Sequence, residues 1–329
     1  MNEKSQKPVH LAFLGCGFAT QIHSKTLSGF KKQVRLYYAS RSAEKAAQFN
    51  QKYRGAGYFD SYEKAIENSD IDVVLVATPP AQHLELTLMA LRASKHVIVE
   101  KPPFLHSTDF DLVKQEQNKS GKQVFVAENY YYKPLAFKLR KLLQDEVIGE
   151  VLFFHINALK AQKTENWRDD LNLAGGGALF EGGIHWVNFV ANLGFPIELT
   201  HAYTPGIRSP LEKSILISFK FKEGPVGALY YSWEVPSLFK GLRLSKIYGR
   251  EGSITFESNG VFLIVRGRRK LFSFPGFADI AGYKSMFRDF FHAIQNNTSP
   301  QFTLQLARRD LELIEMIYTS MIEKMEEVR

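Results

Sequence analysis

From residue 9 to residue 128, short apolar runs alternate with segments of helical periodicity. Five runs rich in Val, Ile, Leu and aromatic residues have the length of buried strands: residues 9–15, 34–40, 72–80, 95–100 and 122–128. Amphipathic stretches lie between them, among them residues 42–53, 81–94 and 107–121. This alternation predicts a doubly wound parallel sheet with helices on both faces. Ligands of such a sheet bind beyond the carboxyl ends of its strands.

Length and composition limit the remaining possibilities. A chain of 329 residues exceeds the size at which one core usually stops growing, which predicts two domains. A hydrophobic content of 45% is ample for large cores. The single cysteine, Cys16, excludes an internal disulfide. The polar N-terminal sequence and the lack of an apolar run of about 18 residues predict a cytoplasmic protein without a membrane span.

The formal net charge of +8 suits an anionic ligand such as a phosphorylated cofactor. Nucleic acid is disfavoured because the basic residues are spread along the chain. The densest cluster, residues 265–270, lies in an apparent hairpin without a zinc, helix-turn-helix or RNA-binding signature nearby. A solvated basic hairpin is the preferred interpretation. No metal site is predicted either, because one cysteine and scattered histidines give no zinc spacing.

The first predicted strand ends in the glycine turn "GCGFAT". Gly15 would allow the tight turn, and Gly17 would let a pyrophosphate approach the backbone. The helix that begins at Phe18 and Ala19 would direct its amide groups at the phosphates. Thr20 stands where a third small residue is usual, which predicts a wider spacing between helix and strand. An ordinary glycine turn is the alternative, but the position after the first strand favours a dinucleotide site.

The end of the second predicted strand bears on the choice of cofactor. A carboxylate there would bind the ribose hydroxyls of NAD, whereas this chain has Ser40 and Arg41. A hydroxyl and a guanidinium suit the 2′-phosphate of NADP better. NADP is therefore favoured over NAD. The alternative is a surface arginine beside Ser42, with Ser42 as the N-cap of the next helix.

Two further strand ends add polar groups. After the third long run, Thr78 and Pro79 form a rigid turn that we expect beside the nicotinamide, and His83 opens a helix, where it caps or contacts the cofactor. Glu100 and Lys101 end the next run. A charged residue is rarely buried without a partner, so Lys101 is a candidate for chemistry, with a plain surface charge as the alternative.

The second half contains eight further strand-like runs, separated by turns with Gly or charged residues. These runs predict a large antiparallel sheet with one covered and one open face; they are residues 150–158, 199–205, 214–221, 227–235, 242–249, 252–258, 261–267 and 270–274. Residues 134–149, 283–297 and 303–327 have helical periodicity. The apolar open face is a plausible interface for a homo-oligomer.

The segment "GGGALFEGGIHWVN" combines three glycines with two titratable groups. On a helix, Glu181 and His185 lie one turn apart on one face, and Asn188 follows at the next step. The glycines would let the backbone and a cofactor come close where this helix begins. A buried histidine bonded to backbone and a helix-surface carboxylate are the alternatives.

Several segments resemble the Gfo/Idh/MocA oxidoreductases. These are the "GCGFAT" turn, "ATPPAQH", "KHVIVEKP", "VAENYYYKP", "NWRDD" and "GGGALFEGGIH", and they occur in the family's order between about residues 9 and 190. The resemblance implies an NAD(P)-binding Rossmann domain, residues 1–129. It also implies an α+β domain for substrate binding and oligomerisation, residues 130–329, with a mainly antiparallel sheet. Family substrates are usually sugars, cyclitols or other polyols, bound between the domains.

The resemblance also implies which residues act. The lysine of "EKP", Lys101, and the pair Glu181 and His185 would line the active site. In the hydride transfer that we expect, His185 would take the alcohol proton, because its ordinary pKa of about 6.5 suits a base near neutral pH. Lys101 would stabilise the developing alkoxide, and Glu181 would bind a neighbouring hydroxyl. Candidates for substrate contact are Tyr130, Trp167, Arg168 and Asn188.

The chain departs from the family pattern at three positions. Glu181 and Asn188 stand where Asp is usual or frequent, and Tyr131 stands where a basic residue is common. The departures bear on the identity of the substrate, and two other functions stay open beside the dehydrogenase. One is a catalytically silent dinucleotide-binding sensor, and the other is a reductase of dihydrodiols or of C=N or C=C bonds. A retained lysine, imidazole and carboxylate favour the dehydrogenase.

Overall fold

The computed structural model describes residues 7–163, 168, 170–205, 211–222, 224–236 and 241–327. The chain forms two compact units. Unit 1 comprises Met1–Glu128 together with Tyr283–Ala307, and unit 2 comprises Asn129–Gly282 together with Arg308–Arg329. A helix late in the sequence therefore completes the first unit. The assignment of residues 1–129 to the cofactor and of 130–329 to substrate and oligomer contacts stays a prediction.

Unit 1 contains a six-stranded parallel sheet in the order β3-β2-β1-β4-β5-β6. The strands are β1 (Val9–Leu14), β2 (Val34–Ala39), β3 (Gly57–Phe59), β4 (Val73–Val76), β5 (His96–Val99) and β6 (Val124–Val126). The doubly wound prediction is confirmed: strand order reverses beside β1, between β2 and β4. The short edge strand β3 was not predicted, because three residues carry too little pattern to mark a strand.

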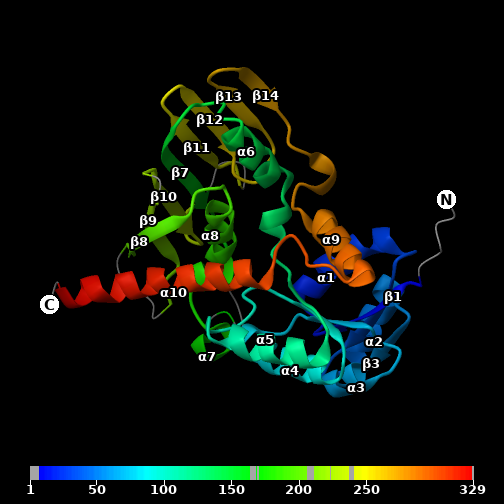
Figure 1. Ribbon diagram of the computed structural model, residues 1–329. Coiled ribbons are helices and arrows are strands. Elements are labelled where there is room, and N and C mark those ends of the chain that lie inside the picture. The colour runs from blue at the N-terminus through cyan, green and yellow to red at the C-terminus, as the bar shows by residue number, and fades with distance from the viewer. Residues whose placement is uncertain are drawn as a thin grey trace. The chain divides into compact units, whose positions relative to one another are not determined.

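The helices of unit 1 begin and end at residues with clear physical roles. They are α1 (Phe18–Leu27), α2 (Ala43–Tyr53), α3 (Tyr62–Glu67), α4 (His83–Arg92), α5 (Asp109–Ser120) and α9 (Tyr283–Asn296) (Figure 1). Ser42 caps α2 by accepting a hydrogen bond from the Lys45 amide. Gly121, at φ +66°, ends α5. Helix α9 joins the sheet through the ring contact of Phe290 with Phe125, whose centroids are 5.0 Å apart.

Unit 2 contains an eight-stranded sheet in the order β14-β13-β12-β11-β7-β10-β9-β8. Its strands coincide with the eight predicted runs: β7 (Val151–Leu159), β8 (Ile197–Tyr203), β9 (Ser214–Phe221), β10 (Val226–Ser232), β11 (Leu244–Gly249), β12 (Gly252–Glu257), β13 (Leu263–Arg266) and β14 (Lys270–Ser273). Only the β7–β10 pair is parallel among these strand pairs. The prediction of a mainly antiparallel sheet is confirmed. The basic cluster lies in the β13–β14 hairpin, where Arg268 pairs with Glu251.

The two faces of this sheet differ in burial, as strand alternation predicts. On β7, Phe154 and Ile156 are buried, whereas Phe153 and His155 are exposed. Helix α8 (Ile184–Ala191) packs on the covered face (Figure 1), where the rings of Phe189 and Phe256 lie 6.1 Å apart.

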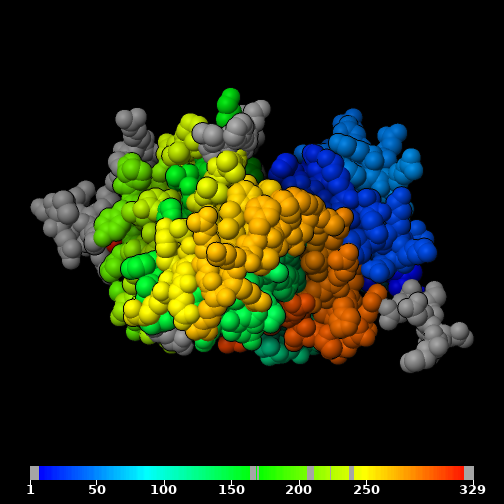
Figure 2. All heavy atoms as spheres, turned by 90° about the horizontal axis from the view of Figure 1, so that it is seen from above, coloured from blue at the N-terminus to red at the C-terminus, as the bar shows by residue number. Residues whose placement is uncertain are grey.

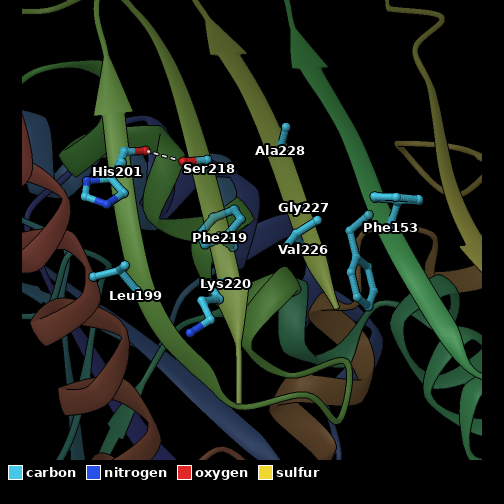
Figure 3. Close-up of a pocket in the computed structure, with 10 residues that line it drawn as sticks. Phe153, Leu199, His201, Ser218, Phe219, Lys220, Val226, Gly227 and Ala228 are labelled. Carbon is cyan, nitrogen blue, oxygen red and sulfur yellow. Dashed lines mark hydrogen bonds between the residues drawn. The ribbon is translucent and has the colours of Figure 1, made fainter. Parts of the chain in front are cut away.

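The open face carries exposed apolar side chains and is hollowed. A shallow depression of about 490 Å³ lies over β7 to β10 (Figure 3), with Phe153, Leu199 and Val226 among its lining residues. Figure 2 shows residues of β12 to β14 at the surface in yellow and orange. On β14, Phe272 belongs to this exposed apolar surface.

The remaining helices of unit 2 include one deviation from the predicted geometry. Three are α6 (Pro134–Gln144), α7 (Leu171–Ala174) and α10 (Leu304–Glu327, which also includes the last residues of unit 1). Before α8, Leu179–Gly183 form a π-helical turn, where one α-helix was expected. A π turn is wider than an α turn and is frequent at functional sites.

Across the described residues, no helix is long and apolar enough to cross a membrane.

The triple glycine makes room for the protein's own side chains. Gly175 has φ +78° and ends α7. A Cβ on Gly176 would lie 2.5 Å from Cβ of Phe180. A Cβ on Gly177 would collide with the Glu212 carboxylate and would lie 2.6 Å from the Glu212 backbone oxygen. The described contacts at Gly176 and Gly177 are therefore with Phe180 and Glu212. The close approach of this segment to a cofactor stays a prediction.

Glu212 ties this segment to a distant part of the chain. Its carboxylate accepts hydrogen bonds from the Leu179 amide at 2.8 Å and the Tyr318 hydroxyl at 2.9 Å. Its backbone carbonyl accepts one from the Ala178 amide. Burial raises the pKa of the Glu212 carboxyl against the opposing effect of these bonds. The helical turn that carries Glu181 therefore starts from a fixed anchor.

Substituting Gly177→Ala should lower the free energy of unfolding by about 1–3 kcal/mol, because the added methyl group overpacks the contact with Glu212. Urea denaturation checks this value. The matched control is Gly29→Ala, where a Cβ meets nothing within 4 Å. Equal stability of both variants would contradict the close contact at residue 177.

Candidate active site

The glycine turn after β1 has the geometry that a pyrophosphate needs. Gly15 has φ +109°, and a Cβ there would lie 2.7 Å from the Ala77 carbonyl oxygen, so only glycine fits. Gly17 is the N-cap of α1, and a Cβ on it would meet nothing within 4 Å. No side chain caps this helix, and its first turn, which includes Phe18 and Ala19, has no acidic residue. An open backbone at an uncapped helix N-terminus fits a dinucleotide phosphate.

Thr20 takes the place of the third small residue without disturbing this turn. The residue is fully buried, and its hydroxyl donates a hydrogen bond to the Gly15 carbonyl oxygen at 2.6 Å. The threonine thus ties α1 to the end of β1. The wider spacing between helix and strand stays a prediction.

Ser40 and Arg41 follow β2, as predicted. Ser40 is 7% exposed, and its hydroxyl oxygen accepts a hydrogen bond from the Ser42 amide at 3.3 Å. Arg41 is exposed and lies near the Tyr62 hydroxyl. Burial raises the pKa of Tyr62, and the Arg41 guanidinium opposes that rise. A buried hydroxyl beside an exposed cation remains compatible with a ribose 2′-phosphate.

His83 holds two loops of unit 1 together. Its Nδ1 lies 2.9 Å from the Pro102 carbonyl oxygen, and its Nε2 lies 2.8 Å from the Thr78 carbonyl oxygen. Burial lowers the pKa of His83, although both carbonyl groups oppose this effect. The imidazole is 1% exposed and bridges the Thr78–Pro79 turn and the loop after Lys101. These two contacts make His83 a buried support that holds both loops in place.

Glu100 is bound from both sides. One carboxylate oxygen pairs with Nε2 of His23 on α1, and the other accepts a hydrogen bond from the Lys101 amide at 3.2 Å. Burial acts to raise the pKa of the Glu100 carboxyl, but His23 and the Lys101 charge hold that pKa below its ordinary value. The predicted residues Glu100 and Lys101 therefore share one hydrogen-bonded corner at the end of β5.

In unit 2, Tyr130 and His185 are in direct contact. Their rings stack with centroids 4.4 Å apart at an interplanar angle of 12°. Trp186 meets the Tyr130 ring edge-on, and the Lys133 ammonium lies 4.3 Å from the centre of that ring. His185 is half-buried, while Lys133 is 4% exposed. The predicted base is therefore held against an aromatic ring that also contacts a buried cation.

Arg168 and Glu181 are brought together by an ion pair. Nε and Nη2 of Arg168 both donate to one oxygen of Glu181 at 3.2 Å. Glu181 is 8% exposed within the π-helical turn. The next residue, Gly182, leaves space for the Tyr231 hydroxyl, which a Cβ would strike. The charge of Glu181 is thus oriented by an arginine that the sequence had marked only for substrate contact.

Two other predicted substrate contacts have different outcomes. Asn188 is fully buried, and its amide donates to Asp310 at 2.6 Å, so a substrate has no access to it in this conformation. Asn188 lies one helical turn after His185, and its side chain points to the interior of unit 2 because α8 packs on the sheet. Trp167 lies outside the described residues.

Sequence reasoning did not single out three side chains at these sites: His23, Lys133 and Tyr231. Each is 4% exposed or less. His23 lies on the buried face of α1 with Thr20, Ser24 and Leu27, so that face has no apolar pattern that would have marked His23 as buried. Lys133 directly precedes Pro134 and could be recognised as buried only from the fold.

Family models match both halves of the chain. The model described as "Oxidoreductase family, NAD-binding Rossmann fold" matches residues 9–128, and the GFO/IDH/MocA C-terminal domain matches residues 137–255. Levoglucosan dehydrogenase of Pseudarthrobacter phenanthrenivorans is 24% identical over 77% of this chain and 71% of its own length. An oxidoreductase of Formosa agariphila is 25% identical, and the match spans 56% of this chain and 60% of that protein.

Two further similarities agree with these matches. A dTDP-3,4-didehydro-2,6-dideoxy-alpha-D-glucose 3-reductase of Saccharopolyspora spinosa is 31% identical over 55% of this chain and 54% of its own length. The fold is shared with the solved complex of levoglucosan dehydrogenase with NADH, at a TM-score of 0.86 and 20% identity over 96% of this chain and 97% of that one. The chain therefore belongs to the Gfo/Idh/MocA family of oxidoreductases, with an NAD(P)-binding Rossmann fold in its N-terminal half.

Proposed function

We propose that the protein is an NAD(P)-dependent dehydrogenase for a CH–OH group of a sugar, a cyclitol or another polyol. The observation that carries this proposal is the open, uncapped and acid-free N-terminus of α1 at Gly17. A dinucleotide held there supplies a hydride-accepting nicotinamide. The names of the levoglucosan dehydrogenase and of the dTDP-sugar 3-reductase support a sugar-type substrate.

The cofactor is proposed to be NADP, bound through Gly15, Gly17 and the amides of Phe18 and Ala19. Ser40 and Arg41 would receive the 2′-phosphate. Thr78, Pro79, Glu100 and Lys101 complete the proposed cofactor contacts. The buried His83, predicted as a further contact, would act only by holding the Thr78 loop in place. A guanidinium near a phosphate gains charge-assisted hydrogen bonds that a ribose hydroxyl does not offer.

Arg41→Ala should weaken NADPH binding roughly 10- to 100-fold, the equivalent of a charged hydrogen bond of about 1.5–3 kcal/mol. NADH binding should change little, because NADH has no 2′-phosphate. Titration calorimetry measures both. Arg35→Ala, which removes an exposed charge at the other end of β2, is the matched control. Preferential NADH binding by the wild type would overturn the NADP assignment.

The chemistry is proposed to rest on three side chains. His185, held flat against Tyr130, takes the hydroxyl proton of the substrate. The Lys101 ammonium stabilises the negative charge that develops on that oxygen. Glu181, oriented by Arg168, accepts a hydrogen bond from a neighbouring substrate hydroxyl. This last role suits a polyol, which presents adjacent hydroxyl groups.

His185→Asn and Lys101→Ala should each lower kcat/KM about 10²- to 10⁴-fold, the usual contribution of a proton-transfer group. NADPH affinity should stay close to that of the wild type for His185→Asn. Steady-state kinetics over a panel of sugars and polyols gives these values, with the exposed His292→Asn on α9 as control. Tight NADPH binding without turnover of any panel member would favour the sensor function instead.

The open face of the unit 2 sheet is proposed to bind a second copy of this chain. Tyr248, Phe153 and Val226 form one row across β11, β7 and β10. Tyr230 and Tyr203 belong to a second row on the same face. All five are exposed. Exposed apolar side chains repeated along successive strands form a patch that another protein can cover, and the same patch on a second copy can meet it across a two-fold axis.

Phe153→Glu should convert the oligomer to monomers, because two-fold symmetry places two new carboxylates in one apolar interface. Sedimentation velocity gives the mass of each species. Phe153 is 53% exposed, and Leu112 on α5 is 47% exposed. Leu112→Glu is thus a matched control that should leave the mass unchanged. A monomeric wild type would contradict the proposed interface.

A further inference from the structure

His23 lies in unit 1 at a position that neither the sequence motifs nor the proposed chemistry uses. Its ring is 1% exposed, and its only hydrogen bond among the described residues joins Nε2 to Glu100. Tyr283 and Phe287 of α9 pack against the ring edge-to-face, with centroids 5.4 and 5.2 Å away. An imidazole buried among aromatic rings costs free energy that an apolar side chain would not. Its contact with Glu100 is the interaction that offsets this cost.

Glu100 transmits this contact to Lys101. With one oxygen on His23 and the other on the Lys101 amide, the carboxylate cannot rotate without losing a bond. The peptide group that carries the Lys101 side chain is therefore fixed from α1, the helix that follows the glycine turn. We propose that His23 is a positioning residue, which acts through Glu100 to hold the Lys101 backbone in place.

This inference rests on the proposed function for its catalytic consequence, but its structural part can be measured without turnover. Amide hydrogen exchange at Lys101 reports the bond to Glu100 directly. Pro102 and Pro103 have no amide hydrogen, so a proteolytic fragment that ends after them concentrates the signal on the residues just before them.

The experiment compares three variants of the full chain. His23→Leu removes the donor to Glu100, and His23→Gln keeps an N–H donor of similar reach. Ser24→Ala is the matched control, because it removes the buried hydroxyl on α1 that accepts a hydrogen bond from Tyr38 without touching Glu100. Thermal unfolding of each variant shows whether it folds. For the variants that fold, the exchange rates and the kinetic constants are then compared with those of Ser24→Ala.

We expect exchange at Lys101 to become roughly fivefold faster in His23→Leu, the equivalent of one lost hydrogen bond of about 1 kcal/mol. Exchange should stay near the wild-type rate in His23→Gln and Ser24→Ala. With an active substrate, His23→Leu should lower kcat roughly 10- to 100-fold while KM for substrate and the Kd for NADPH change little, because a misplaced group affects the reacting geometry. His23→Gln should recover most of that loss.

The outcomes separate the two proposals. Unchanged exchange at Lys101 in a folded His23→Leu variant overturns the positioning role, whatever the activity. Faster exchange together with an unchanged kcat overturns its catalytic consequence. A wild type that turns over no substrate refutes the proposed function alone, and the exchange rates then still decide whether His23 holds Lys101.

Discussion

Burial of polar side chains, each against a specific partner, is the constraint on which both candidate sites depend. A buried carboxylate or imidazole loses its hydration, and this loss is tolerated only where a hydrogen bond replaces the water. Glu100 has His23 and the Lys101 amide, and Glu212 has the Leu179 amide and the Tyr318 hydroxyl. These bonds fix the backbone from which Lys101 and Glu181 project. The chemistry proposed for this protein therefore depends on polar contacts that never touch a substrate.

The start of α1 differs from these satisfied positions. Its amide groups receive no side-chain cap, and the space above Gly17 is open. Polar groups left available at a helix N-terminus favour an anion, and a family with an NAD-binding Rossmann fold supplies the matching ligand. Residues such as Glu100 and Glu212, whose hydrogen bonds are made within the protein, hold the site in place. The open turn at Gly17 is instead available to bind the cofactor.

The glycines of the chain serve different physical purposes despite their similar appearance in the sequence. Gly15 avoids a collision with the Ala77 carbonyl, whereas Gly17 leaves open space. Gly177 admits the carboxylate of Glu212, and Gly182 admits the hydroxyl of Tyr231. Gly177 and Gly182, on either side of Glu181, thus make room for side chains of the protein itself, a purpose that the sequence pattern alone does not reveal. The partner residues are 35 and 49 positions away in the sequence, so no local pattern contains them.

The sequence by itself determined the strands of both sheets, apart from the three-residue β3, because hydrophobic periodicity is a local property. It also determined the glycine turn and the contrast between the two faces of the second sheet, whereas the N-cap at Ser42 was only the alternative to a 2′-phosphate site. Only the tertiary structure decided that Asn188 is buried against Asp310, that Arg168 orients Glu181, and that His23 meets Glu100. These pairs are separated by 122, 13 and 77 residues, and folding alone brings them within hydrogen-bond distance. Burial and pairing of this kind arise from the packing of distant elements, which residue type and spacing do not specify.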